Sequence, residues 1–276
     1  MVKNNFFKKL NNFIIAEAGI NHNGKIKTAL RLIDVAKKNG ASAIKFQTYI
    51  TEKRIKKKYR KIFDILKKCE LKFEEFKIIS DYCKHKKINF FSTPFDRESV
   101  NFLDSINVKL FKIASFDIGN YELINEVLKT KKPTIISTGM ASLKEIDKVY
   151  KIYKKNKVDL ALLHCVSSYP NTDSSSYLSN INFLKNRFDC EIGISDHTND
   201  IKIPIYGNLI GANIIEKHLK ISENHKCVDA PVSITGKQLY ALKLETENIK
   251  KILNVASFGT RKVEKGSRIF KRNKIL

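Results

Sequence analysis

Several residue types and patterns are scarce in this chain, and each scarcity excludes a class of protein. The 276 residues include no tryptophan and only five cysteines, none of them in a CxxC pair. Because isolated cysteines do not form a disulfide framework, we expect free thiols and a reducing, cytoplasmic setting. No stretch approaches the roughly 18 uninterrupted apolar residues of a membrane span, and the N-terminus lacks the apolar region of a signal peptide.

Acidic residues are also few: 28 Asp and Glu stand against 52 Lys and Arg, which gives a formal net charge of +24. Three explanations stay open, namely compositional drift in an AT-rich genome, attraction of a small acidic substrate, and binding of nucleic acid. The positive charges are spread along the whole chain, with one denser run at Lys53–Lys61. This spread favours drift, and we do not expect nucleic acid as a partner.

What the chain does contain is a regular alternation of short apolar runs and helical stretches. Each run is almost continuously apolar, as expected for parallel strands that are covered on both faces. The predicted strands are 13–19, 43–49, 89–95, 110–115, 133–138, 160–165, 191–196 and 214–219.

The segments between these runs have helical periodicity. Ala29, Ile33 and Ala36 share one face, and Ser142 with Glu145 forms a capping box at the start of another helix. Eight strand–helix repeats predict a single-domain α/β fold, the (β/α)8 TIM barrel. An open doubly wound sheet is the alternative, but no GxGxxG motif follows the first strand.

We expect residues 1–258 to form the barrel and residues 259–276 to form a basic C-terminal tail without a core of its own.

Polar residues follow every predicted strand at its carboxyl end, where barrels of this type carry their chemistry. His197 and His218 stand at equivalent points of the last two strands, so we expect two neighbouring imidazoles and a divalent metal. His164 also stands at a strand end, but it lies deeper, and we expect it to be buried and hydrogen-bonded.

Two lysines lie inside apolar strands, where a cation requires a buried anion. Lys45 and Lys112, together with Ser115, Ser137 and Ser195, could bind a phosphate plus a carboxylate. Either lysine could instead form a Schiff base with a carbonyl substrate, and the spacing alone does not decide between these roles.

The motifs at the strand ends resemble those of the N-acetylneuraminate (sialic acid) synthase family. The resemblance runs from about residue 13 to residue 233 and covers nearly the whole predicted barrel. The matching stretches are IIAEAGINHNG (14–24), GASAIKFQTY (40–49), FFSTPFDRESV (90–100), FKIAS (111–115), KPTIISTGMASLKEI (132–146), LLHCVSSYP (162–170), GISDHT (193–198) and IEKHL (215–219).

The resemblance implies an enzyme that condenses phosphoenolpyruvate with an open-chain N-acetylated amino hexose to a nine-carbon 2-keto acid and phosphate. It implies that His197 and His218 bind Mn2+ or Mg2+, that Glu17 holds a water on the metal, and that Asp117 takes the place of a catalytic glutamate. The remaining implied residues bind substrate: Lys45, Gln47, Thr93, Lys112, Ser115, Ser137, Tyr169, Ser195 and Asp229. Lys112 is expected to take part in catalysis as well, and a cytoplasmic homodimer is the implied form.

Three departures from the family pattern stand out. Asp117 is one methylene shorter than the usual glutamate, and the preceding Phe116 is more typical of synthases for pseudaminate or spore-coat sugars. Ala230 follows Asp229 where the family usually has histidine. The family also carries a C-terminal antifreeze-like cap, which would begin near Leu276, so we expect an open rim or a separate cap polypeptide.

Two rival functions remain at the level of sequence. One is a Schiff-base aldolase that uses Lys45 or Lys112. The other is a catalytically lapsed barrel that serves as a polyanion-binding or scaffold protein.

Overall fold

Eight parallel strands close into a barrel, as predicted, and neighbouring strands follow the order of the chain from β1 to β8. The computed structural model describes residues 6–10, 12–255 and 258–272. The strands are β1 (Phe13–Gly19), β2 (Ala43–Thr48), β3 (Asn89–Pro94), β4 (Phe111–Ile113), β5 (Thr134–Ser137), β6 (Leu160–Cys165), β7 (Glu191–Asp196) and β8 (Ile214–His218). The (β/α)8 fold class is therefore confirmed.

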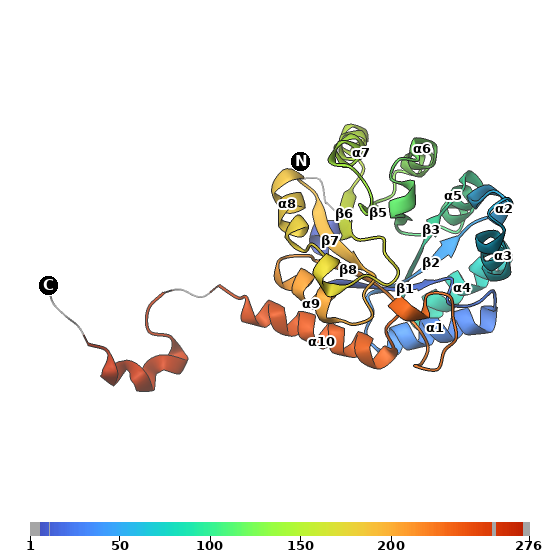
Figure 1. Cartoon of the computed structure of the whole chain (residues 1–276). Coiled ribbons are helices and arrows are strands. Elements are labelled where there is room, and N and C mark those ends of the chain that lie inside the picture. The colour runs from blue at the N-terminus through green and yellow to red at the C-terminus, as the bar shows by residue number, and fades with distance from the viewer. Residues whose placement is uncertain (1–5, 11, 256–257, 273–276) are drawn as a thin grey trace.

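Helices surround the barrel as an outer layer (Figure 1). They are α1 (Ile26–Lys38), α2 (Thr51–Arg54), α3 (Arg60–Cys69), α4 (Phe73–Lys86), α5 (Arg97–Ser105), α6 (Tyr121–Lys129), α7 (Leu143–Asn156), α8 (Ser179–Arg187), α9 (Lys202–Leu209) and α10 (Gly236–Ile252). The expected capping box opens α7, where the Ser142 and Glu145 side chains each bind the other's backbone amide. Two additional helices, α2 and α3, lie between β2 and α4, where the regular repeat has one helix.

Side chains alternate along each strand between the helix layer and the barrel interior. On β2, Ile44 and Phe46 pack in the large core beneath the helices, whereas Ala43 belongs to the interior cluster. The same interior cluster holds residues near the beginning of other strands, such as Ile15 and Ile214, and Phe7 packs against it from the N-terminal segment. The interior is therefore apolar at the end where the strands begin.

At the other end of the barrel, the inward positions are polar. The alternation that points Ala43 inward also points Lys45 inward, and the same step of two residues leads from Ile15 to Glu17 and from Ile214 to Glu216. These three charged side chains are almost fully buried. The fold thus gathers buried charges at the carboxyl ends of the strands.

Five strands are shorter than predicted, four of them by one or two residues and the fourth strand by three. The fourth strand covers only Phe111–Ile113 instead of 110–115, because Ser115–Asp117 turns into a single 3-10 turn. This turn carries Ser115 and Asp117 to the rim of the barrel.

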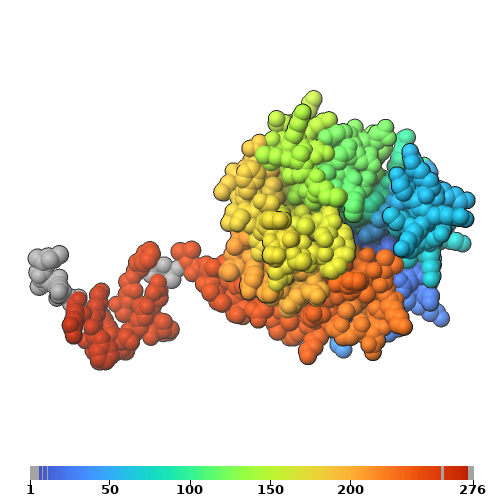
Figure 2. Space-filling model, viewed as in Figure 1, coloured from blue at the N-terminus to red at the C-terminus, as the bar shows by residue number. Residues whose placement is uncertain are grey.

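Beyond α10 the described chain leaves the barrel (Figures 1 and 2). Lys262–Phe270 forms a 3-10 segment, and Val263, Ile269 and Phe270 in it are exposed. The boundary at residues 258 and 259 stays a prediction, and part of the predicted tail, 273–276, lies outside the described residues. Among the described helices, none is both long and apolar enough to cross a membrane.

Candidate active site

Two lysines and two carboxylates form the floor of a small cavity at the carboxyl end of the barrel, which we call the central cavity. Lys45 Nζ lies 2.7 Å from Glu17 Oε2 and 3.6 Å from Glu216 Oε2. Lys112 Nζ lies 3.9 Å from Glu216 Oε1, so Glu216 stands between the two ammonium groups. The cavity measures about 50 Å3. Lys45 therefore has an anion on the neighbouring strand β1, and Glu216 on β8 reaches across the barrel to Lys112 on β4.

Burial and mutual attraction set the protonation of these four groups in different directions. Burial raises the pKa of Glu17, against the pull of Lys45. Burial acts on Glu216 in the same sense, but Lys112 and Lys45 outweigh it and lower the pKa of Glu216 to about 2. For Lys45, the attraction of Glu17 and Glu216 exceeds the effect of burial and raises the pKa, whereas burial lowers the pKa of Lys112. The pKa values of the two carboxylates in this cavity thus shift in opposite directions.

Hydroxyl groups surround the two lysines. Lys112 Nζ donates to Ser137 Oγ at 2.6 Å, and Lys45 Nζ donates to Thr93 Oγ1 at 3.0 Å. Ser195 Oγ donates to Glu216 Oε1 at 3.0 Å, and Ser115 Oγ accepts from the Gly139 amide. The structure therefore brings together all the residues that the sequence proposes for a phosphate and a carboxylate.

The two histidines predicted as a pair lie side by side. The His197 and His218 ring centroids are 5.5 Å apart, and the Tyr169 ring lies 4.1 Å from the ring of His197. His197 Nδ1 is 2.9 Å from the Val166 carbonyl, and His218 Nδ1 is 3.3 Å from Asp229 Oδ2. Each imidazole thus faces an oxygen acceptor through Nδ1, which leaves Nε2 for another partner.

The chain turns sharply beside this pair. Gly19 has a φ of +51°, and a Cβ at this position would lie 3.1 Å from Asp229 Oδ2 and 3.3 Å from Glu17 Oε1. Glycine is favoured here because it adopts a left-handed conformation and leaves room for both carboxylates.

His197 and His218 fit a divalent metal, but they would supply only two of its ligands. Metal-binding histidines usually donate the second ring N–H to a carbonyl or carboxylate, as Val166 and Asp229 allow here. The described residues contain no group of three or more His, Cys, Asp or Glu side chains arranged around one point. Two imidazoles would therefore share the metal with water or substrate, as in sites with open positions.

The other residues of the predicted site lie near this center. Gln47 Nε2 is 3.4 Å from Glu17 Oε1. Phe116 lines the cavity, and Asp117 is the next residue in the chain. The Asp117 carboxylate accepts a hydrogen bond from the Asn120 side-chain amide at 3.1 Å. Burial raises the pKa of Asp117. His164 is buried and contacts the Ser176 carbonyl at 2.7 Å, as expected.

Sequence reasoning did not assign the two charged residues Glu216 and Arg54 of the cavity lining. Glu216 could have been found by alternation, because it shares the inward face of β8 with His218. Arg54 belongs to the lysine-rich run and gave no comparable signal. Its guanidinium lies 3.6 Å from the center of the Phe95 ring and donates to Gln47 Oε1 at 3.0 Å.

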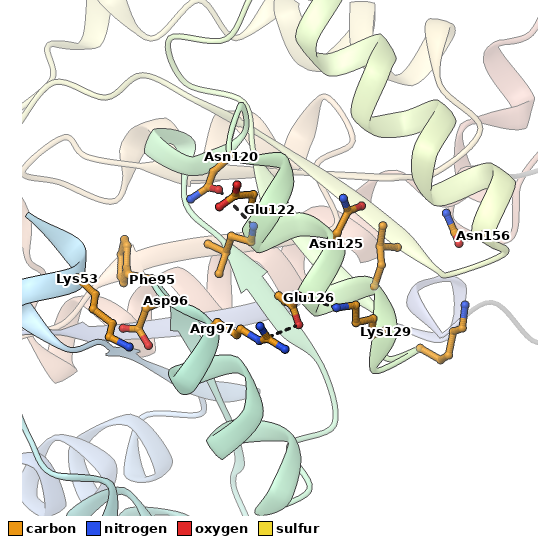
Figure 3. Close-up of a pocket in the computed structure, with 13 residues that line it drawn as sticks. Lys53, Phe95, Asp96, Arg97, Asn120, Glu122, Asn125, Glu126, Lys129 and Asn156 are labelled. Carbon is orange, nitrogen blue, oxygen red and sulfur yellow. Dashed lines mark hydrogen bonds and ion pairs between the residues drawn. The ribbon is translucent and has the colours of Figure 1, made fainter.

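A larger cavity of about 740 Å3 lies outside the barrel, between the side chains of α5 and α6 (Figure 3). We call it the outer cavity. In it, Arg97 and Lys129 both pair with Glu126, at 3.6 and 2.6 Å. Phe95 lines both cavities. The outer cavity contains none of the residues that the sequence predicts for catalysis.

Comparison with known proteins agrees with the motifs. Residues 32–257 match the NeuB family. An uncharacterized protein of Methanocaldococcus jannaschii is 42% identical over 243 residues, which cover 88% of this chain and 69% of the relative. The N,N'-diacetyllegionaminic acid synthase of Campylobacter jejuni is 34% identical over 256 residues, 87% of this chain and 77% of that protein.

Solved structures give the same answer. The N-acetylneuraminic acid (sialic acid) synthetase of Leptospira borgpetersenii, crystallized with citrate, superimposes with a TM-score of 0.90 and 39% identity. The match covers 94% of this chain and 91% of that one. The predicted relationship to sialic acid synthases is confirmed, and the chain belongs to the NeuB family.

Proposed function

We propose that the chain is a nonulosonate synthase that joins phosphoenolpyruvate to an open-chain N-acetylated amino hexose. The observation that carries this proposal is the floor of the central cavity, where Lys45 and Lys112 lie buried among hydroxyl groups beneath two adjacent imidazoles. Buried cations of this kind suit a substrate with a phosphate and a carboxylate.

Phosphoenolpyruvate would bind against the two lysines. Its phosphate would accept hydrogen bonds from Lys45 and Lys112, and the hydroxyls of Ser115, Ser137 and Ser195 can rotate toward its oxygens. Because Glu216 lies between the two ammonium groups, both lysine side chains are oriented before substrate arrives.

His197 and His218 are the residues that would hold Mn2+ or Mg2+, and Asp229 and the Val166 carbonyl would orient their rings. When bound, such an ion supplies Lewis acidity at the aldehyde oxygen of the sugar. Gln47, Tyr169 and Asp117 stand around the same opening and would position the sugar.

The reaction forms a carbon–carbon bond to the aldehyde carbon and a carbon–oxygen bond to water, and it breaks the carbon–oxygen bond to phosphate. The enol carbon of phosphoenolpyruvate attacks the aldehyde carbon, and positive charge develops at the carbon that carries the phosphate. Water adds to that carbon and gives up one proton, which reaches the former aldehyde oxygen and makes it a hydroxyl. The new hydroxyl on that carbon then becomes the ketone, and phosphate leaves with the electron pair of the carbon–oxygen bond and the second proton. Lys45 and Lys112 would stabilise the departing phosphate, and Glu17, which pairs with Lys45, would accept the first proton of the water.

One observation favours a second candidate. Burial lowers the pKa of Lys112, and a neutral amine could form a Schiff base as in an aldolase. The synthase requires phosphoenolpyruvate and is inhibited by EDTA, whereas the aldolase is trapped by borohydride in the presence of its substrate.

The test is product formation from phosphoenolpyruvate labelled with 13C at C3, with Mn2+ and a panel of acetamido hexoses. We expect a 13C signal of a nine-carbon 2-keto acid and one phosphate per product. Borohydride trapping without phosphoenolpyruvate would contradict the synthase. A homodimer, a separate cap polypeptide and a cytoplasmic location stay predictions from the resemblance.

A further inference from the structure

Arg54 occupies an unusual place at the mouth of the central cavity. Its guanidinium lies 3.6 Å from the center of the Phe95 ring and 4.6 Å from that of Tyr49. Tyr49 is itself fixed, because its hydroxyl donates to the Leu66 carbonyl at 2.9 Å. Cation–π contacts with two rings hold the guanidinium plane and leave its edge free to donate hydrogen bonds.

The short helix that carries Arg54 is also held in place. Asp96 accepts a hydrogen bond from the Ile50 amide at 2.8 Å, and Glu70 accepts from both the amide and the hydroxyl of Thr51. Arg54 is therefore preorganised at the cavity, although it follows strand β2 in an exposed, lysine-rich segment.

A chain of contacts leads from the cavity floor to Arg54. Lys45 pairs with one oxygen of Glu17, Gln47 donates to the other, and Arg54 donates to Gln47 Oε1. Gln47 thus separates the guanidinium from Glu17. The charges of Asp117, Asp229 and Glu17 attract Arg54 from a distance. In the part of the chain that the structure describes, however, no carboxylate forms an ion pair with it.

The other cations near this mouth are neutralised. Lys45 and Lys112 lie within 4 Å of carboxylates on the floor, and Lys53, next to Arg54 in α2, pairs with Glu98 on the outside. In the outer cavity, Glu126 serves both Arg97 and Lys129 (Figure 3). Among the described residues that line the central cavity, Arg54 is thus the cation that has no carboxylate within ion-pair distance.

We propose that Arg54 binds an anionic group, a phosphate ester or a carboxylate, that the acceptor sugar carries at the end away from its aldehyde. This inference rests on the proposed function and names the class of its second substrate. Lys45 and Lys112 serve phosphoenolpyruvate at the floor, whereas Arg54, beyond Gln47, faces the part of the cavity left to the sugar. A guanidinium held edge-on suits bidentate contact with either oxyanion.

The experiment compares three acceptors with one ring: N-acetylmannosamine, its 6-phosphate and its 6-carboxylate. Phosphate release from phosphoenolpyruvate gives kcat/KM for each, and calorimetry with metal removed gives each Kd without turnover. We expect at least one anionic sugar to exceed the neutral sugar by about 10- to 150-fold in the parent protein. The phosphate and carboxylate arms show which oxyanion is preferred.

Variants assign this preference to one residue. Arg54→Gln should bring the ratio of anionic to neutral sugar close to one, through KM rather than kcat, and Arg54→Lys should keep part of it. Lys53→Gln is the matched control, because it removes the same charge from the same helix outside the cavity, and it should keep the full ratio.

The two proposals fail in different ways. If no sugar causes phosphate release, the synthase proposal fails for these acceptors. The ratio of Kd values for anionic and neutral sugars still tests whether Arg54 binds the anionic group. If the parent does not prefer an anionic sugar, or if Arg54→Gln keeps the preference, the inference is overturned and Arg54 serves only to balance Asp117 and Asp229.

Discussion

The central and outer cavities place their charges differently. The outer cavity, about 740 Å3, contains exposed ion pairs around Glu126, whereas the central cavity, about 50 Å3, buries Lys45, Lys112, Glu17 and Glu216 almost completely. Exposed ion pairs contribute little to stability, while buried charges require partners and carry a large desolvation cost. Several buried charges that line one cavity are typical of a functional site, so this cluster, and not cavity size, favours the central cavity.

The strongest way to break this contrast is to remove the carboxylate between the two buried lysines. Glu216→Gln keeps the shape of the side chain but leaves two ammonium groups with less compensation. We expect a loss of about 3–5 kcal/mol in the free energy of unfolding, the typical cost of removing one partner of a buried ion pair. Denaturant unfolding measures this loss. Added inorganic phosphate should restore part of it, and a variant as stable as the parent would contradict the account.

The second largest effect is expected when either histidine of the imidazole pair is removed. His197→Ala and His218→Ala should each weaken Mn2+ binding by more than about 100-fold, since the loss of an outer partner alone costs about 10- to 100-fold. Both variants should keep the fold, because rim side chains do not hold the barrel core. Calorimetry and electron spin resonance measure the affinity. His164→Ala is the control, because His164 also stands at a strand end but contacts the Ser176 carbonyl and does not line the central cavity. Unchanged Mn2+ binding in both variants would exclude the pair.

Lys112→Ala tests the floor of the cavity. A buried charge-assisted contact with phosphate is worth about 1.5–3 kcal/mol, so kcat/KM for phosphoenolpyruvate should fall about 10- to 150-fold. Steady-state phosphate release measures this, with exposed Lys109→Ala as the control. Lys112→Glu should be worse, because it opposes the anion. Kinetics like those of the parent would show that phosphate binds elsewhere.

The smallest effect is expected in the outer cavity. Glu126→Gln removes a carboxylate that serves two cations, just as Glu216→Gln does, but its partners are exposed. The thermal midpoint and the rate of phosphate release should stay close to those of the parent. A loss comparable to that of Glu216→Gln would remove the distinction between the two cavities.

Sequence patterns predicted most of the barrel because strand burial and helix periodicity are local properties. Each of the eight strands lies within its predicted range, and the paired histidines at the ends of β7 and β8 lie 5.5 Å apart, as their matched positions indicated. The largest difference, at the fourth strand, is also local, since Ser115–Asp117 forms a turn instead of extending the strand.

The site was less predictable where distant segments meet. Lys45 and Lys112 required anions, but only the closed barrel shows that Glu216 on the last strand lies between the two ammonium groups. Arg54 is one of many basic residues in its segment, and its role at the cavity depends on how Phe95 and Tyr49 pack against it. Patterns along the chain report which face a residue occupies, but not which charge will lie opposite.

Hydrogen exchange with and without phosphoenolpyruvate tests most directly whether the central cavity is the binding site. Backbone amides at the carboxyl ends of β2, β4 and β5 should gain protection in the parent protein, while α5 and α6 around the outer cavity should not change. The protection should weaken in Lys112→Ala and persist in Glu126→Gln. Protection confined to α5 and α6, or its loss in Glu126→Gln alone, would contradict the assignment of phosphoenolpyruvate to the buried lysines.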